Sequence, residues 1–362
     1  VIVAFTMMAA YYVNDVVAPL KTMLETDLAW SSTDFGFFTG GYSFLNVFFL
    51  MLIWGGLILD RFGIRFTGKL ATILMVGGTA LEYYAMTGLA GTDATLFGIN
   101  EIFGYKTGVF VAFAGYSIFG VGAEVAGITV SKIIAKWFKG KELATAMGVQ
   151  VALARIGSQA GYAVAIPLAR AFGISTPVLL GLVLLLGGMI AFFVFTVMDK
   201  KLDKQMEAAA IAAGTEDEEE KFSFKDVKNI LVNPGFWLIA LLCVLFYSCV
   251  FPFQKFASEL MIIKYGINEN VAGTFAGLPA LGALILTPVF GGFIDKRGKS
   301  ASIMLLGSAM LICVHFIYAI PDINYWLVAI VLMIILGIAF SLVPSAMWPA
   351  VAKIFPVSQL GT

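Results

Sequence analysis

The sequence predicts an all-α membrane protein, and its composition, charge distribution and apolar runs all support this fold class. Hydrophobic residues make up 60% of the 362 residues, charged residues only 13%, and the mean hydropathy is +0.93. A soluble domain carries about 25% charged residues. Of the 23 basic and 23 acidic residues, 15 lie between Asp199 and Lys228, which leaves too few elsewhere to cover a water-soluble surface. The apolar runs lack the alternation of barrel strands, so the spanning segments are predicted to be helices.

Ten apolar runs are long enough to cross a bilayer, which takes about 20 helical residues. In chain order, these runs cover residues 1–20, 35–60, 66–90, 107–137, 142–169, 175–198, 235–263, 270–294, 301–320 and 324–351. A polar stretch separates the sixth run from the seventh, and its acidic sequence EDEEEK is typical of a solvated loop. We therefore predict a first bundle of six helices over 1–198, a linker over 199–230 and an incomplete second bundle of four helices over 231–362.

The loops between the runs predict the orientation of the chain in the membrane. Basic residues follow the even-numbered runs: Arg61 and Arg65, then Lys136, Lys139 and Lys141, then Lys200, Lys201 and Lys204, then Lys296, Arg297 and Lys299. The loops after odd-numbered runs carry few basic residues and instead contain Glu25, Asp27, Asp93 and Asp322. Because positive residues concentrate on the cytoplasmic side, the even loops and the start of the chain are predicted to be cytoplasmic.

The loop that closes the second run has a counterpart where the eighth run closes. The first reads Gly56-x-x-x-Asp60-Arg61-x-Gly63-x-Arg65, and the second reads Gly291-x-x-x-Asp295-Lys296-x-Gly298-Lys299. Both lie between the second and third helices of their half, which indicates two related halves, as in secondary transporters. We expect the glycines to allow close helix approach and a tight turn. The predicted gating residues, which can pair across a cytoplasmic gate, are Asp60, Arg61, Arg65, Asp295 and Lys296.

This repeated loop resembles the signature of the major facilitator superfamily. The resemblance implies twelve helices in two six-helix bundles that alternate access, and hence that the last two helices are missing from this chain. Further stretches resemble a dipeptide-transporting branch of the superfamily: Gly122-Ala-Glu124, the WFKGKEL block at 137–143, the ARIGS block at 154–158, Tyr247 with residues 250–253, and Met347-Trp348-Pro349 with Leu360-Gly-Thr362. The first run matches more loosely, at Tyr11 and Asp15.

Glu124 and Arg155 are the leading candidates for the substrate site. They lie near the middle of adjacent runs, at similar depth in the bilayer, where a transporter places its substrate. In one interpretation they pair with each other and only hold two helices together, although a buried pair is weak evidence for stability. In the other, Arg155 binds the carboxylate of a zwitterion and Glu124 its ammonium group. The resemblance implies the second pair of roles, and both interpretations can hold in alternating conformations.

Further ionisable residues and small residues have assignable roles in the first, fifth and seventh runs. Asp15 is a candidate to bind a proton or the ammonium group, with Tyr11 close to it in the first run. In the seventh run, Lys255 and Glu259 have the spacing of a helical i,i+4 pair and are interpreted as an outer gate or a rim contact. A GxxxG spacing in the fifth run, from Gly157 to Gly161, predicts close approach of another helix.

Aromatic residues of the seventh and tenth runs are candidates for the walls of the substrate cavity. Pro252 can kink the seventh run and turn neighbouring side chains into a cavity, so we include Tyr247 and Phe251 among the substrate-binding residues. Trp348 of the tenth run is included as well, with a place in the interfacial aromatic belt as its alternative.

The combined prediction is a secondary transporter of small zwitterionic solutes, with dipeptides as the leading substrate. The first alternative is an exchanger of small organic anions anchored by Arg155, and a remote alternative is a membrane scaffold that transports nothing. An enzyme is not expected, because the runs contain no nucleophile–base pair or metal cluster, and His315 is the only histidine. No cofactor or metal is expected, and the zero net charge argues against a nucleic-acid partner.

The predicted partners are the substrate and the lipid bilayer, with the chain acting as a monomer. Protons are a candidate coupling ion, since Glu124 can carry one, whereas the resemblance also allows downhill transport. The sequence contains no N-x-[ST] acceptor for N-glycosylation. This absence favours a bacterial inner membrane, with a lysosomal membrane and a shielding accessory subunit as the alternative in a eukaryotic cell.

Overall fold

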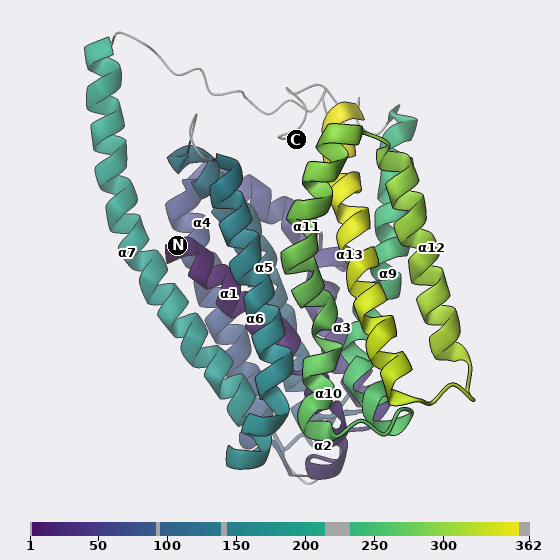
Figure 1. Cartoon of the computed structure of the whole chain (residues 1–362). Coiled ribbons are helices and arrows are strands. Elements are labelled where there is room, and N and C mark those ends of the chain that lie inside the picture. Colours follow the sequence, from purple (N-terminus) through teal and green to yellow (C-terminus); the bar gives the residue numbers. More distant parts are fainter. Residues whose placement is uncertain (1, 92–94, 139–142, 214–231, 355–362) are drawn as a thin grey trace. The chain divides into compact units, whose positions relative to one another are not determined.

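The computed structural model describes residues 2–91, 95–138, 143–213 and 232–354, and most of these residues are helical (Figure 1). The first helices are α1 (Ile2–Val16), the 3-10 helix η1 (Ala18–Leu20), α2 (Lys21–Asp27), α3 (Ser32–Phe48), α4 (Met51–Thr87), α5 (Thr107–Trp137), α6 (Leu143–Phe172) and α7 (Thr176–Ala213). They are followed by α9 (Pro234–Ile263), α10 (Glu269–Ala276), α11 (Leu278–Arg297), α12 (Ser300–Ala319) and α13 (Trp326–Ile354). All ten predicted runs fall mainly on these helices, so the predicted all-helical class is confirmed. The acidic part of the predicted linker lies outside the described residues.

Judged by length and apolar composition, fewer helices of the described residues qualify as membrane spans than the ten predicted runs. Among the described residues, seven helical segments are long and apolar enough to cross a membrane, and the pair α3 and α4, bent by 58°, makes an eighth candidate. This pair covers two predicted runs, because α4 continues past a non-helical residue, Gly63. The remaining run corresponds to α6, which is not among these candidates. Polar residues such as Arg155 and Gln159 lower its mean hydropathy.

A short β-hairpin between α4 and α5 is the one departure from the helical prediction within the described residues. Strand β1 (Glu101–Ile102) pairs with β2 (Tyr105–Lys106) in antiparallel register. The two turn residues between them, Phe103 and Gly104, both have positive φ, at 52° and 80°. This is the backbone conformation of the tight type I′ hairpin turn.

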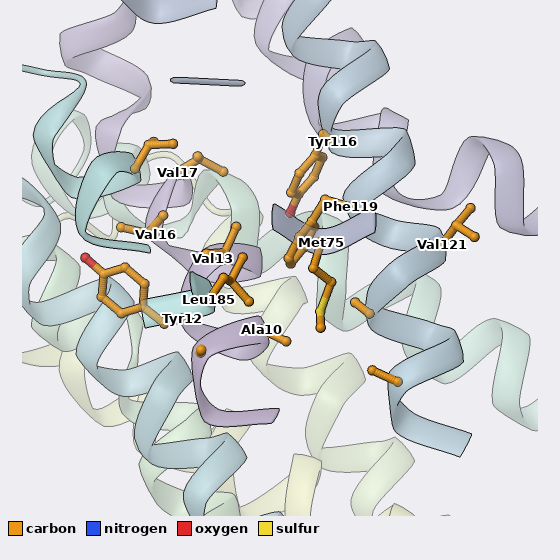
Figure 2. Close-up of a cluster of buried hydrophobic side chains, with 14 of the residues drawn as sticks. Ala10, Tyr12, Val13, Val16, Val17, Met75, Tyr116, Phe119, Val121 and Leu185 are labelled. Atoms are coloured by element: carbon orange, nitrogen blue, oxygen red, sulfur yellow. The ribbon is translucent and has the colours of Figure 1, made fainter. Parts of the chain in front are cut away.

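One compact unit consists of residues 1–199 together with 255–277. Helices α1 and α6 pack closely in this unit. A Cβ added at Gly157 would lie only 2.1 Å from the Met8 carbonyl oxygen, and one at Gly161 only 2.9 Å from that of Tyr12. The close approach predicted from the GxxxG spacing is therefore confirmed. The buried apolar core of the unit joins α1, α4, α5 and α7, as the labelled side chains of Figure 2 illustrate.

The second compact unit consists of residues 200–254 and 278–362, described here up to 354. In it α13 packs against both α11 and α12, and the three helices run side by side (Figure 1). The backbones of α11 and α13 come close at a pair of glycines, since a Cβ added at Gly282 would lie 3.2 Å from the Cα of Gly337.

The repeated loop has a glycine with positive φ at the matching position in both halves of the chain. Gly63 and Gly298 both adopt positive φ, at 74° and 66°, which a glycine accepts without the steric cost of a side chain. The predicted tight turn is thus confirmed. The predicted close helix approach at Gly56 and Gly291 is wrong, because a Cβ added at either position would meet no atom within 4 Å. These two glycines face open space in this conformation.

Candidate functional site

The polar site of the first unit begins where α1 ends. Pro19 lies in the 3-10 turn that follows α1 and has no N–H to continue the helix, and the last carbonyls of a helix lack intrahelical donors. The carbonyl oxygen of Asn14 accepts two hydrogen bonds at this end, from the Tyr116 hydroxyl of α5 at 2.7 Å and from Nζ of Lys255 at 2.5 Å. Three helices thus meet at one backbone carbonyl.

Asp15 lies at the same helix end and is neutralised by a cation from α9. Its Oδ1 accepts a hydrogen bond from Nδ2 of Asn14 at 2.8 Å and lies 3.7 Å from Nζ of Lys255. Nζ of Lys255 also lies 3.1 Å from the hydroxyl of Tyr116. The sequence spacing suggested that Lys255 pairs with Glu259 on its own helix, but each of these residues instead pairs with a residue from the start of the chain.

Glu124 is held by a tyrosine that the sequence analysis did not single out. A Cβ added at Gly120 would lie 2.4 Å from the carbonyl oxygen of Tyr42, so the glycine lets α3 approach α5 closely. One turn further along α5, Oε1 of Glu124 accepts a hydrogen bond of 2.7 Å from the Tyr42 hydroxyl. The only signal in the sequence is a tyrosine in the first third of the second run, and its partner cannot be identified without the fold.

Tyr11 lies among the three ionisable residues proposed for the site. The close contact between α1 and α6 brings the guanidinium carbon of Arg155 to 5.7 Å from the Tyr11 ring centroid, within the range of a cation–π contact. The phenol of Tyr11 is also within electrostatic range of Glu124 and Asp15. The structure therefore brings Asp15, Glu124 and Arg155, from three helices, within electrostatic range of Tyr11, with Arg155 in contact with its ring.

A second polar network lies at the end of the unit predicted to face outward. Lys21 is buried, donates to Glu25 at 2.7 Å and Ser32 at 2.8 Å, and forms an ion pair with Glu259 of α9. Glu259, interpreted from sequence as part of an outer gate or a rim contact, therefore has a specific partner on α2. Burying an ammonium group is costly unless it is paired and hydrogen-bonded, and this network meets that need.

The aromatic candidates lie in the second unit. The rings of Tyr247 and Phe251 are stacked with centroids 5.1 Å apart, and Phe340 of α13 lies edge-on to both, at 6.4 and 6.1 Å. Phe340 completes this aromatic cluster and was not predicted from sequence, because single phenylalanines in apolar runs are indistinguishable from packing residues. Trp348 is exposed.

The predicted gating residues of the first loop make ion pairs inside their own unit. Asp60 pairs with Lys132 of α5 at 2.8 Å, and Nε of Arg65 lies 3.1 Å from Oδ2 of Asp199 on α7. The guanidinium of Arg61 lies 5.5 Å from the ring centroid of Phe62. In the second loop, Lys296 is exposed and the side chain of Asp295 lies outside the described part of the chain. Pairing of these residues across a cytoplasmic gate stays a prediction.

Comparison with known proteins identifies the family. Residues 2–362 match the family model of the Major Facilitator Superfamily. The chain belongs to this family. Among its relatives are the lysosomal dipeptide transporters MFSD1 of Pongo abelii and Homo sapiens, each 28% identical over 375 residues that cover all of this chain and 73% of theirs. The MFSD1 of Danio rerio is 27% identical over 373 residues, or 74% of its length.

Solved structures show the same fold at low sequence identity. A D-xylose–proton symporter superposes with a TM-score of 0.64 at 16% identity, covering 99% of this chain and 84% of its own. A peptide transporter, POT, in complex with sulfate superposes with a TM-score of 0.67 at 13% identity, covering 99% and 82%. The predicted family and helical membrane fold are thus confirmed, and this family member is a multi-pass membrane transporter and not an enzyme.

Proposed function

We propose that this transporter moves small zwitterionic solutes, with dipeptides as the leading class, by alternating access between its two bundles. The observation that carries the proposal is the cation–π contact of Arg155 with Tyr11, whose phenol is also within electrostatic range of Glu124 and Asp15. An acidic and a basic side chain at one aromatic ring suit the two charged ends of an unblocked peptide. The similarity to transporters named for dipeptides supports the same substrate class.

In this proposal the two ends of the peptide are held and its side chains are not. The guanidinium of Arg155 binds the terminal carboxylate through its planar fork of donors, and Glu124 and Asp15 both accept from the terminal ammonium. The termini of an extended dipeptide are about 7 Å apart, at 3.3–3.6 Å per residue. A site that recognises both termini therefore needs two separate groups and tolerates many side chains. Tyr247, Phe251 and Trp348 are proposed as aromatic walls of the cavity from the second bundle.

Two sets of charged residues are proposed as gates. Lys21 and Glu259 close the outer side by joining α2 to α9. Asp60, Arg61 and Arg65, with Asp295 and Lys296 of the second half, stabilise the opposite, outward-facing state by closing the cytoplasmic side. The domain limits, the monomeric state, and a bacterial inner membrane or a lysosomal membrane as location stay predictions.

The proposal is tested by thermal unfolding of the full-length protein with a panel of ligands. A ligand at about 100 times its Kd adds about 2.7 kcal/mol to stability, which raises Tm by about 5 °C or more. We expect many free dipeptides to do this, and N-acetylated or C-amidated forms to fail. Glu124→Gln and Arg155→Ala should each abolish the shift, whereas Glu101→Gln, an exposed residue of the hairpin, serves as the matched control and should retain it.

Three results would contradict the proposal. Equal stabilisation by free and blocked dipeptides would exclude recognition of the termini. Stabilisation by dicarboxylates alone, with a mild effect of Glu124→Gln, would favour the anion exchanger anchored by Arg155. Uptake into vesicles that is unchanged by Arg155→Ala would remove Arg155 from the transport mechanism.

A further inference from the structure

Glu82 of α4 is a buried acidic residue that the proposed peptide site does not use. Its side chain is fully buried, and neither carboxyl oxygen has a hydrogen-bond partner among the described residues. Its burial follows from the tight packing of α4 on α5, since a Cβ added at Gly115 would lie 3.0 Å from the backbone nitrogen of Glu82. An ionised carboxylate is rarely left in such surroundings, because burying a charge without partners is costly.

Glu82 borders a cluster of charged and titratable groups that come from three other helices. Lys255 of α9 and Tyr116 of α5 are within electrostatic range of it. Tyr116 and Lys255 are also within range of Asp15 of α1. The hydroxyl of Tyr116 lies 3.1 Å from Nζ of Lys255, and Nζ lies 3.7 Å from Asp15. Lys255 is therefore within electrostatic range of two carboxyl groups, and in this conformation it pairs with Asp15.

We propose that Glu82 is a proton-binding site. It loses its proton when a substrate binds Asp15 and Lys255 pairs with Glu82 instead. In the conformation described here, Lys255 neutralises Asp15, and Glu82 carries a proton. When the ammonium group of a substrate approaches Asp15, Lys255 turns to Glu82 and forms an ion pair with its carboxylate. The O–H bond of Glu82 breaks and its proton passes to water, so the cluster exchanges one proton for the cationic end of the substrate.

This inference rests on the proposed function only for the identity of the substrate. The protonation of Glu82 is a property of the substrate-free protein and can be measured without any peptide. The linkage to substrate then follows from the competition between Glu82 and Asp15. Failure of peptide binding and failure of the proton site are therefore distinguishable.

The first measurement is the infrared absorption of protonated carboxyl groups in the substrate-free, full-length protein at neutral pH. We expect a band that is lost in Glu82→Gln and retained in the control Glu101→Gln. The band should also be lost in Asp15→Asn, which leaves Glu82 intact but frees Lys255 to pair with it. Because Asp15→Asn does not alter Glu82 itself, it keeps the test decisive if Glu82→Gln does not fold. A band that persists in either variant would overturn the proposal.

The second measurement counts protons released in a weakly buffered solution when a dipeptide binds. Release should approach one proton per bound dipeptide in the unmodified protein and in Glu101→Gln. It should disappear in Glu82→Gln, whose dipeptide affinity should then lose its dependence on pH, which is at most about tenfold per pH unit for one linked proton. Release that is absent in the unmodified protein, or unchanged in Glu82→Gln, would overturn the linkage.

Discussion

Replacing Asp199 by asparagine tests whether a buried carboxylate holds three helices together at one end of the first unit. Asp199 is 0% exposed and accepts hydrogen bonds from Nζ of Lys136 at 2.9 Å and from Nε1 of Trp137 at 3.0 Å. It also lies 3.1 Å from Nε of Arg65. Asparagine keeps the shape and one acceptor oxygen for the indole N–H, but it removes the charge that the two cations share.

The expected cost can be worked out from these contacts. Breaking a buried ion pair costs about 3–5 kcal/mol when the remaining charge stays buried. The side chains of Arg65 and Lys136 are 34% and 27% exposed, so both recover part of their hydration when Asp199 is replaced. We therefore expect a loss of about 2 kcal/mol, near the value of a single hydrogen bond to a charged group. For a unit of this size, Tm should fall by about 4–8 °C.

Asp60→Asn is the matched control, because Asp60 also pairs with a lysine of α5. The Asp60–Lys132 pair has a similar length, 2.8 Å, but its side chains are 61% and 51% exposed. Such a pair is worth about 0–1 kcal/mol and weakens further in salt. The assay is thermal unfolding of the purified full-length protein at one fixed heating rate, in low and high salt. An Asp60→Asn loss as large as that of Asp199→Asn would refute the reasoning that burial sets the value of these pairs.

Three further predictions concern helix contacts and the peptide site. Gly157→Leu should lower Tm and abolish dipeptide binding because it forces α1 away from α6, whereas Gly148→Leu on the same helix, where an added Cβ meets nothing within 4 Å, should be tolerated in both assays. Tyr42→Phe removes the hydrogen bond to Glu124 and should weaken dipeptide affinity about fivefold, for a bond of about 1 kcal/mol; titration that finds unchanged affinity would remove Tyr42 from the site. Gly63→Ala should cost about 1–3 kcal/mol in thermal unfolding, since φ 74° and ψ 174° lie in a region adopted almost only by glycine, and an unaffected Tm would contradict this strain.

Sequence predicts the helices well because the signal for a membrane span is local. Each run had to be apolar over its whole length, and the positions of the helices follow from that requirement alone. The turns at Gly63 and Gly298 were predictable for the same reason, because a glycine repeated at one loop position indicates a backbone conformation with positive φ. Hydropathy could not predict that α4 continues past Gly63 and joins the second and third runs in one bent element.

The site was predictable only where a charge lay in the middle of an apolar run. Glu124 and Arg155 met that criterion and were predicted as site residues, whereas Glu82 met it as well and was overlooked. The partners could not be predicted, because they depend on tertiary contacts. The spacing of Lys255 and Glu259 favoured a pair along one helix, yet helix ends from the start of the chain supply stronger partners for both.

The division of α9 between the two compact units has a mechanical consequence. The helix belongs to one unit up to Gln254 and to the other from Lys255 onward, and the chain returns after Gly277. Both crossings occur beside a proline, Pro252 in the first case and Pro279 in the second. Since a proline has no N–H to donate to the preceding turn, α9 lacks one helical hydrogen bond at Pro252, and the second crossing lies where α10 has ended and α11 begins. Fewer backbone hydrogen bonds therefore oppose bending of the chain at these two places than inside an unbroken helix.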